Sequence, residues 1–135
     1  MTIGHAIVTT QAINAVLNDN GQPRKLPFKI KLRLTRVKEA LEKEAQAYEE
    51  ERVRLVNEYG EETEAPDGTK TIEVKDPEKI EKFYKDLEEV LKTEINPTYQ
   101  RLSKEELKSI EELEIDITEP QIRAFFEYVV EKEAQ

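Results

Sequence analysis

The strongest constraint on the fold is an apolar stripe that runs through the middle of the chain with the period of an α-helix. From Ile30 to Tyr59 a stripe residue recurs about every 3.6 positions, which is the repeat of a straight helix with one buried face. The stripe consists of Ile30, Leu34, Val37, Leu41, Ala45, Tyr48, Arg52, Leu55 and Tyr59. The sequence therefore predicts one long helix over residues 27–59, and Gly60 would end it by adopting a left-handed conformation.

The start of this helix has a second interpretation. Between Leu26 and Leu34 the apolar residues also alternate with Lys29, Lys31 and Arg33, which is the period of a half-buried strand. Cations in the first turn oppose the helix dipole by about 0.3–1 kcal/mol each. A proline suits the first helical turn. We therefore favour a helix from Pro27 and keep a strand over residues 26–34 as the alternative.

The predicted helix is too long for a compact chain of 135 residues. At 1.5 Å per residue it spans about 50 Å, whereas a domain of this size has a diameter of roughly 36 Å. The helix should project beyond its domain, so its far end needs cover from the following segments or from a second subunit. Leu41, Leu55 and Tyr59 are the residues that we predict to form an interface.

Shorter elements surround the long helix. Residues 2–8 could form a strand or an extended arm, and a short helix over 10–19 could be capped by Thr9 or Thr10 and stopped at Asn18–Gly21. The turn-forming run from Ala65 to Thr69 predicts a small β-ribbon over residues 61–75. Asp76 and Pro77 then open a helix, predicted over residues 77–95, that must end before Asn96-Pro97.

Two capping boxes mark the C-terminal part, residues 103–132. Ser103 pairs with Glu106 and Thr118 pairs with Gln121 at the spacing that caps a helix N-terminus. The alternation of residues 113, 115 and 117 between the boxes predicts an extended segment. The last helix should direct five apolar residues inward: Ile122, Phe125, Phe126, Val129 and Val130. The predicted fold is a single, mainly α domain in which the long helix packs with three or four shorter helices and a small β-ribbon.

The composition removes most catalytic and metal-binding chemistry. The chain has one histidine, His5, and no cysteine, so thiolate sites and sites with several histidines are excluded. We predict no enzyme activity, no cofactor and no metal. Glu61, Glu62, Glu64 and Asp67 could loosely gather a cation, but a solvated loop explains them better. There is no signal-peptide pattern and no apolar run of about 20 residues, which predicts a protein without membrane association. The acidic balance argues against general nucleic-acid binding.

The charge is unevenly distributed. Residues 24–38 contain seven lysines and arginines and no acid, within a chain of net charge −9, which leaves −16 for the rest. On a helix Lys29, Arg33 and Arg36 would share one face, and arginine suits bidentate contact with carboxylate or phosphate. Such a run is more often a solvated face or is neutralised by the chain's own glutamates. The alternative is a site for an anion or an acidic partner, formed by Lys29, Arg33, Arg36 and Tyr48, with Phe28 as a further aromatic face.

Several segments resemble a family of small uncharacterised proteins encoded by tailed phages and prophages of Gram-positive bacteria. The resemblance rests on Leu26-Pro-Phe-Lys, the Glu/Lys-rich helix that ends at Tyr59-Gly60, the Asp76-Pro-Glu-Lys helix start and the Leu113-Glu-Ile-Asp-Ile-Thr-Glu-Pro stretch. It covers roughly residues 26–130 and implies a phage origin and a helical fold. It implies no catalytic residues, and the first twenty residues match less clearly.

Together these observations predict a phage-encoded, non-enzymatic helical interaction protein with a protein partner, either a second copy or a host or phage protein. Its role would be virion assembly, a minor structural part of the virion, or the binding of a host factor, in the host cytoplasm or on the virion. The alternative is an oligomeric sponge or inhibitor of host antiviral defence. In that case the basic block would bind a small phosphorylated nucleotide signal. A homo-oligomer is expected in either case.

Overall fold

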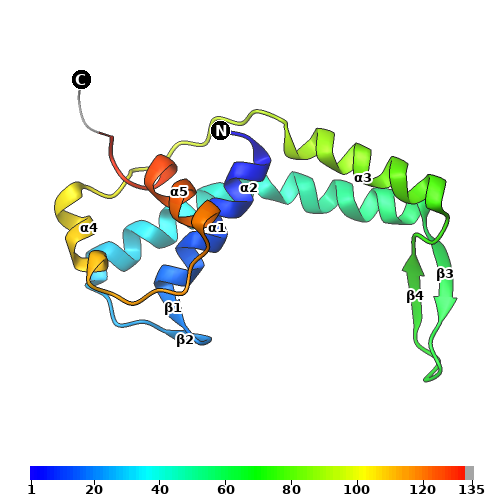
Figure 1. The fold of residues 1–135 in the computed structure, drawn as a ribbon, viewed down its shortest axis with the longest axis horizontal. Coiled ribbons are helices and arrows are strands. Elements are labelled where there is room, and N and C mark those ends of the chain that lie inside the picture. The colour runs from blue at the N-terminus through cyan, green and yellow to red at the C-terminus, as the bar shows by residue number, and fades with distance from the viewer. Residues whose placement is uncertain (133–135) are drawn as a thin grey trace.

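One long helix connects the two parts of the molecule. The computed structural model describes residues 1–132, and within them it contains five helices and two two-stranded ribbons. The long helix α2 (Phe28–Tyr59) packs its first half into a head with α1 (Ile3–Leu17), α4 (Lys104–Glu111) and α5 (Glu119–Tyr128). Its second half projects from the head as an arm, together with α3 (Pro77–Leu91) and a β-ribbon (Figure 1). The mainly α fold with a long central helix, four shorter helices and a small ribbon is confirmed.

The segment at the start of α2 is helical and does not form the alternative strand. Pro27 is the residue before the first helical turn, and the helical positions Ile30, Leu34, Val37 and Leu41 are all buried. A strand over 26–34 would instead have buried Phe28 on the face of Leu26, yet the Phe28 side chain is 77% exposed. The burial of four residues with helical spacing outweighs the weaker cost of cations near the helix N-terminus.

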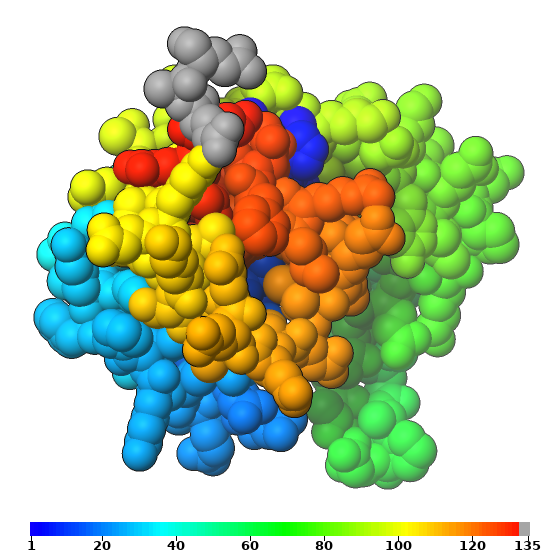
Figure 2. All heavy atoms as spheres, turned by 60° about the vertical axis from the view of Figure 1, so that its left-hand side comes forward, coloured from blue at the N-terminus to red at the C-terminus, as the bar shows by residue number. Residues whose placement is uncertain are grey.

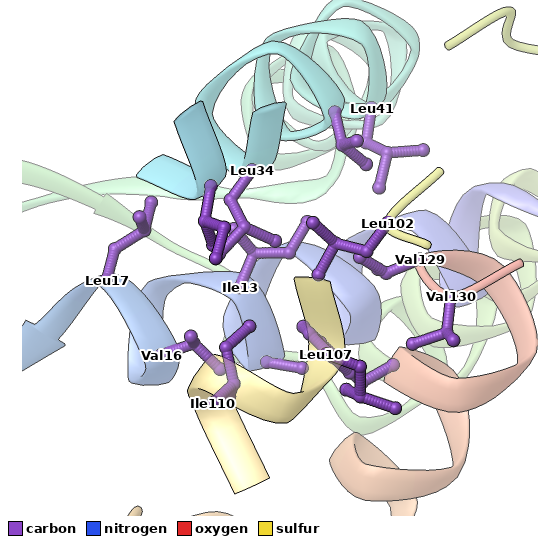
Figure 3. Packing of buried hydrophobic residues seen from close by; sticks show 14 of the residues in the cluster. Ile13, Val16, Leu17, Leu34, Leu41, Leu102, Leu107, Ile110, Val129 and Val130 are labelled. Atoms are coloured by element: carbon purple, nitrogen blue, oxygen red, sulfur yellow. The ribbon is translucent and has the colours of Figure 1, made fainter. Parts of the chain in front are cut away.

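The core of the head lies where α1, α2, α4 and the C-terminal segment meet (Figure 3). Ile13 and Leu34 are fully buried and belong to α1 and α2. Leu102 and Val129, also fully buried, come from the segments that flank α4 and α5. The 113–117 segment is extended without pairing as a strand, and its three alternating apolar residues pack partly buried against this core.

The expectation for the N-terminus was wrong. Residues 2–8 form neither a strand nor an arm, because α1 begins at Ile3 and Thr2 caps it. The Thr2 hydroxyl accepts from the His5 amide, and His5 Nδ1 accepts from the Thr2 amide at 3.0 Å. Thr9 does not cap a helix, because its hydroxyl donates to the carbonyl of His5 within α1. A Thr/His pair thus replaces the usual Ser/Thr–Glu/Gln capping box, and Thr10 likewise donates to Ala6.

A short ribbon follows α1. Strands β1 (Asn18–Asp19) and β2 (Gln22–Pro23) pair antiparallel, and the two residues between them, Asn20 and Gly21, have φ of 52° and 80°. Two positive φ values are typical of a two-residue hairpin turn. The stop at this point was predicted, but the hairpin was not.

The arm consists of two antiparallel helices and the predicted β-ribbon at their far end. Strand β3 (Glu61–Glu64) pairs with β4 (Lys70–Glu73), with Glu61 opposite Glu73, and the turn around Pro66 and Gly68 is as expected. Asp76 caps α3 through the amide of Glu78. The helix ends at Leu91 rather than at residue 95, because the following segment turns back to the N-terminus, where the amide of Ile3 donates to the carbonyl of Thr93.

Gly60 ends α2 for a different reason from the one predicted. Its φ is −84°, so it is not left-handed. A Cβ at this position would collide with the carbonyl of Val56 and with the side chain of Ile72 in β4. The glycine is needed because the ribbon folds closely against the end of the helix.

The last helix differs from its prediction in length and in which face is buried. Both capping boxes of the C-terminal part are present, but α5 ends at Tyr128, because Leu102 pairs with Val130 as an isolated β-bridge. Phe125 is buried as expected, whereas Ile122 is 40% exposed and Phe126 52% exposed. These two lie on a neighbouring face of α5 that no described segment covers. None of the described helices is both long and apolar enough to cross a bilayer.

Candidate anion-binding pocket

Three cations of the basic block line one pocket in the head. Lys29, Arg33 and Arg36 come from the first turns of α2, and the opposite wall is the segment that leads into α4. The cavity has a volume of about 460 Å³ and is lined by Lys29, Leu32, Arg33, Arg36, Thr98, Tyr99 and Gln100. No carboxylate is among these lining residues, so the pocket offers positive charge to an anion in a protein whose net charge is −9.

The wall opposite α2 is held in place by the end of α5. The Tyr99 hydroxyl donates to the carbonyl of Tyr128 at 2.7 Å, and Arg101 donates to the carbonyl of Glu127 at 2.7 Å. The amide of Leu102 donates to the carbonyl of Val129 at 2.8 Å. Burial raises the pKa of Tyr99, which keeps its hydroxyl a donor. The aromatic ring beside the three cations is therefore a fixed part of the pocket.

One of the three cations has a partner within the chain. Arg33 Nη1 lies 2.5 Å from Glu106 Oε1, and the two side chains are only 18% and 11% exposed. The same carboxylate accepts from the amide of Ser103, because Glu106 is the third residue after Ser103 and completes the capping box of α4. This hydrogen bond, followed by the charges of Arg33 and Lys29, lowers the pKa of Glu106. The internal pairing that the sequence favoured is thus present for Arg33.

The other two cations remain available. Lys29 and Arg36 are exposed, and neither makes an ion pair within residues 1–132. Behind Arg33 lies a second depression of about 550 Å³, where Glu105, Glu106 and Glu131 offset the positive charge. Lys29 and Arg33 line both depressions, whereas Arg36 lines only the first, so the acids lie next to the pocket on the side of Lys29 and Arg33.

The remaining cations of the block have separate roles. Arg24 donates from Nε to the carbonyl of Val16 at 3.1 Å, at the C-terminus of α1, where a positive charge also favours the helix dipole. Lys38 pairs with Glu42 one turn further along α2 at 3.7 Å. Lys25 and Lys31 are exposed. The block is therefore part structure, part solvated surface and part pocket.

The structure does not bring Tyr48 to the pocket. Tyr48 lies twelve residues after Arg36, which is about 18 Å along the helix axis, and it belongs to the arm. Phe28 is exposed and does not line the pocket either. The aromatic residue beside the cations is Tyr99. Sequence reasoning missed it because it follows Asn96-Pro97 in a segment with no periodicity, and nothing in the sequence places this segment against α2.

The predicted interface residues are used within the chain. Leu41 and Leu55 are 0% and 1% exposed, the first within the head core and the second on the arm half of α2. Tyr59 is partly buried and donates a hydrogen bond to Asp86 of α3 at 2.9 Å. The second half of α2 and α3 cover each other, so the apolar stripe is not the surface that would meet another subunit.

His5 and the acidic residues of the ribbon turn make contacts within the chain. His5 Nδ1 lies 3.0 Å from the Tyr128 hydroxyl, and the two rings stack. Asp67 accepts from the amide of Thr69 in the ribbon turn, and Glu62 pairs with Lys70 across the ribbon. Over the part of the chain that the structure describes, no three histidine or acidic side chains gather as they would around a metal ion.

Comparison of the chain with protein-family models, with curated proteins and with solved structures finds no match.

Proposed function

We propose that this protein is a phage-encoded, non-enzymatic helical interaction protein that binds an acidic surface of a protein partner through the pocket of Lys29, Arg33 and Arg36. The observation that carries the proposal is the placement of three cations in one pocket without a lining carboxylate. An acidic protein would rather pair such cations internally, as it does with Arg33 and Glu106. Lys29 and Arg36 stay exposed, and an exposed pair of this kind accelerates the approach of an acidic partner.

A binding role agrees better with the residues than a catalytic one. The single histidine is bound to Thr2 and Tyr128, and the chain has no cysteine. Arginine and lysine in a pocket recognise carboxylate and phosphate without any reaction. The phage origin rests on the resemblance of residues 26–130. The neighbouring genes test it, since tail genes on both sides favour a role in virion assembly and a cluster of small early genes favours the binding of a host factor.

The proposal is tested by reversing the two free charges. We expect Lys29→Glu combined with Arg36→Glu to abolish partner binding and to leave the helical circular dichroism signal unchanged, because both side chains are exposed. The matched control is Lys82→Glu combined with Lys85→Glu, which changes the net charge equally on exposed positions of α3 in the arm. Proteins captured from host extract are quantified for the wild type and both variants.

The salt dependence of binding is a second test of the proposal. Between 50 and 500 mM salt the screening length falls from about 14 Å to about 4 Å, so a partner held by the pocket should be released. A partner that is retained equally by the wild type and the pocket variant contradicts the proposal. If only the control variant loses the partner, the arm and not the pocket is the binding surface.

A second candidate function uses the same pocket for a small phosphorylated ligand, such as a nucleotide signal of host defence. It is favoured by the pocket's volume, which lies within the range of about 300–1,000 Å³ for small-molecule sites, and by the ring of Tyr99 beside the cations. Thermal unfolding with 1 mM inorganic phosphate and with mono-, di- and cyclic nucleotides tests it. A ligand at about 100 times its Kd stabilises the fold by about 2.7 kcal/mol, and no shift with any compound would exclude this function.

A further inference from the structure

The outer face of α5 carries exposed apolar residues next to a depression. Ile122 and Phe126 lie one turn apart and are 40% and 52% exposed. The depression beside them has a volume of about 700 Å³ and lies between α1 and α5. Its lining residues are His5, Val8, Pro120, Arg123, Ala124, Phe126, Glu127 and Tyr128. Figure 2 shows α5 (orange to red) at the surface of the head, beside α4 (yellow). This face combines a projecting aromatic side chain with a hollow.

Two opposite charges flank the apolar residues on the same helix. Arg123 is followed four residues later by Glu127, and their side chains are 77% and 53% exposed. Each has a partner on its own chain, Glu119 for Arg123 and Lys132 for Glu127. Both ion pairs are at the surface, where such pairs contribute little and are readily exchanged. The α5 face thus has a positive and a negative position one turn apart, beside an apolar pair with the same spacing.

The exposed residues of α5 are arranged so that this face complements the same face of a second copy. When two copies of a helix pack antiparallel about a two-fold axis, each residue on one side of the axis meets its counterpart from the other side. An axis near Ala124 brings Ile122 of one copy to Phe126 of the other. It also brings Arg123 of each copy to Glu127 of the other, which makes two equivalent ion pairs.

We propose that a second copy of this chain docks on the α5 face and forms a two-fold symmetric dimer, with Phe126 of each copy covering the depression of the other. This goes beyond the proposed function, because the pocket for the acidic partner lies on α2 and remains open. A lipid surface or an unrelated apolar peptide would also cover Ile122 and Phe126. Neither carries the two opposite charges that would pair with Arg123 and Glu127 across the contact, whereas a copy of the same face does.

The test uses charge reversal on the full chain. Light scattering coupled to gel filtration, at 10–100 µM protein as the order of magnitude at which weak dimers form, should give twice the chain mass of 15.7 kDa. Arg123→Glu makes both flanking positions negative, and Glu127→Arg makes both positive, so each variant alone should be a monomer. An equimolar mixture of the two variants should dimerise, because every negative position then meets a positive one. The matched control, Lys82→Glu on α3, should remain a dimer.

Three results would overturn the proposal: a monomeric wild type, dimers of both single variants, or a mixture that stays monomeric. Circular dichroism verifies that each variant is folded. A second measurement does not depend on the charge variants. Because the chain has no cysteine, Arg123→Cys mixed with Glu127→Cys should form a disulfide-linked heterodimer under mild oxidation, whereas Lys82→Cys mixed with either should not. Absence of the selective cross-link also overturns the dimer.

Discussion

The Tyr59 hydroxyl donates a hydrogen bond of 2.9 Å to Asp86 Oδ2 and so joins the two helices of the arm. Tyr59 is the last residue of α2, whereas Asp86 lies past the middle of α3. The bond therefore fixes how far the two helices can slide along each other. The carboxylate of Asp86 raises the pKa of Tyr59, because the hydrogen bond requires the protonated phenol.

We predict that Tyr59→Phe loosens the arm and leaves the head intact. The amides of α3 should exchange with solvent faster in the variant, measured by hydrogen exchange, while those of α1 keep their protection. The wild type should approach the variant at high pH. A raised folded pKa stabilises the fold below the unfolded value of about 10, and this contribution is lost as the pH rises through the folded value. Tyr84→Phe, at an exposed tyrosine of α3, is the control and should change nothing.

The Arg33–Glu106 pair predicts a second pH dependence, of opposite sign. The pKa of Glu106 is lowered by its bond to the Ser103 amide and by the nearby charges. Its charge therefore stabilises the fold above the unfolded pKa of about 4.3, and this contribution is lost as the pH falls through the folded value. Glu106→Gln should lower the free energy of unfolding by about 1–2 kcal/mol at pH 7.

The measurement is urea unfolding of the wild type and of Glu106→Gln at pH 7 and pH 3. The contribution of the carboxylate charge is lost as the pH falls through the lowered pKa of Glu106, so the difference between the two proteins should be smaller at pH 3 than at pH 7. Glu105→Gln, at an exposed neighbour in the same turn, should have little effect at either pH. A difference that is equal at both pH values would mean that the carboxylate charge is not what stabilises the contact.

The elements that the sequence predicted best are those whose signal is local. The stripe of α2 and the caps at Asp76, Ser103 and Thr118 depend on residues a few positions apart, and all are present. The start of α1 was missed because a Thr/His capping pair is unusual and because Thr9 and Thr10 also suit a cap. Their hydroxyls bond instead to carbonyls one turn earlier.

The candidate pocket could be only half predicted. Lys29, Arg33 and Arg36 share a helix face by spacing alone, so the sequence contains this wall. The other wall depends on contacts between distant segments, such as Tyr99 with Tyr128 and Leu102 with Val129. Nothing in the order of the residues reports those contacts. For the same reason the pairing of Arg33 with Glu106, 73 positions away, could be expected in kind but not assigned to a residue.

Gly60 provides a steric prediction at the junction of α2 and the ribbon. A methyl group there meets the Val56 carbonyl and the Ile72 side chain. Gly60→Ala should therefore destabilise the arm by about 1–3 kcal/mol, as overpacking usually does, and detach the ribbon from the helix end. Thermal unfolding and the exchange of the β4 amides measure this. Adding Ile72→Ala should recover only part of the loss, because the carbonyl remains. Full recovery would show that the side chain alone makes the contact too close.

The last prediction concerns the independence of the arm from the head. Leu34 is buried in the head core, whereas Leu55 lies on the arm half of α2 and is also buried. Replacing either with alanine should cost about 2–5 kcal/mol locally. Apart from α2 itself, the arm joins the head near the N-terminus, where the amide of Ile3 donates to the carbonyl of Thr93 and that of Ile95 to the carbonyl of Met1.

Because this junction is small, we expect the arm to open without the head. Leu55→Ala should reduce hydrogen-exchange protection in α3, the ribbon and the second half of α2, and leave α1 and α5 protected. Leu34→Ala should reduce protection throughout the chain, since it weakens the head core that holds the first half of α2, and the arm is attached to the head through this part of the helix. If Leu55→Ala lowers the protection of α1 as much as that of α3, the chain unfolds as one cooperative unit, and the arm is a rigid extension of the head core.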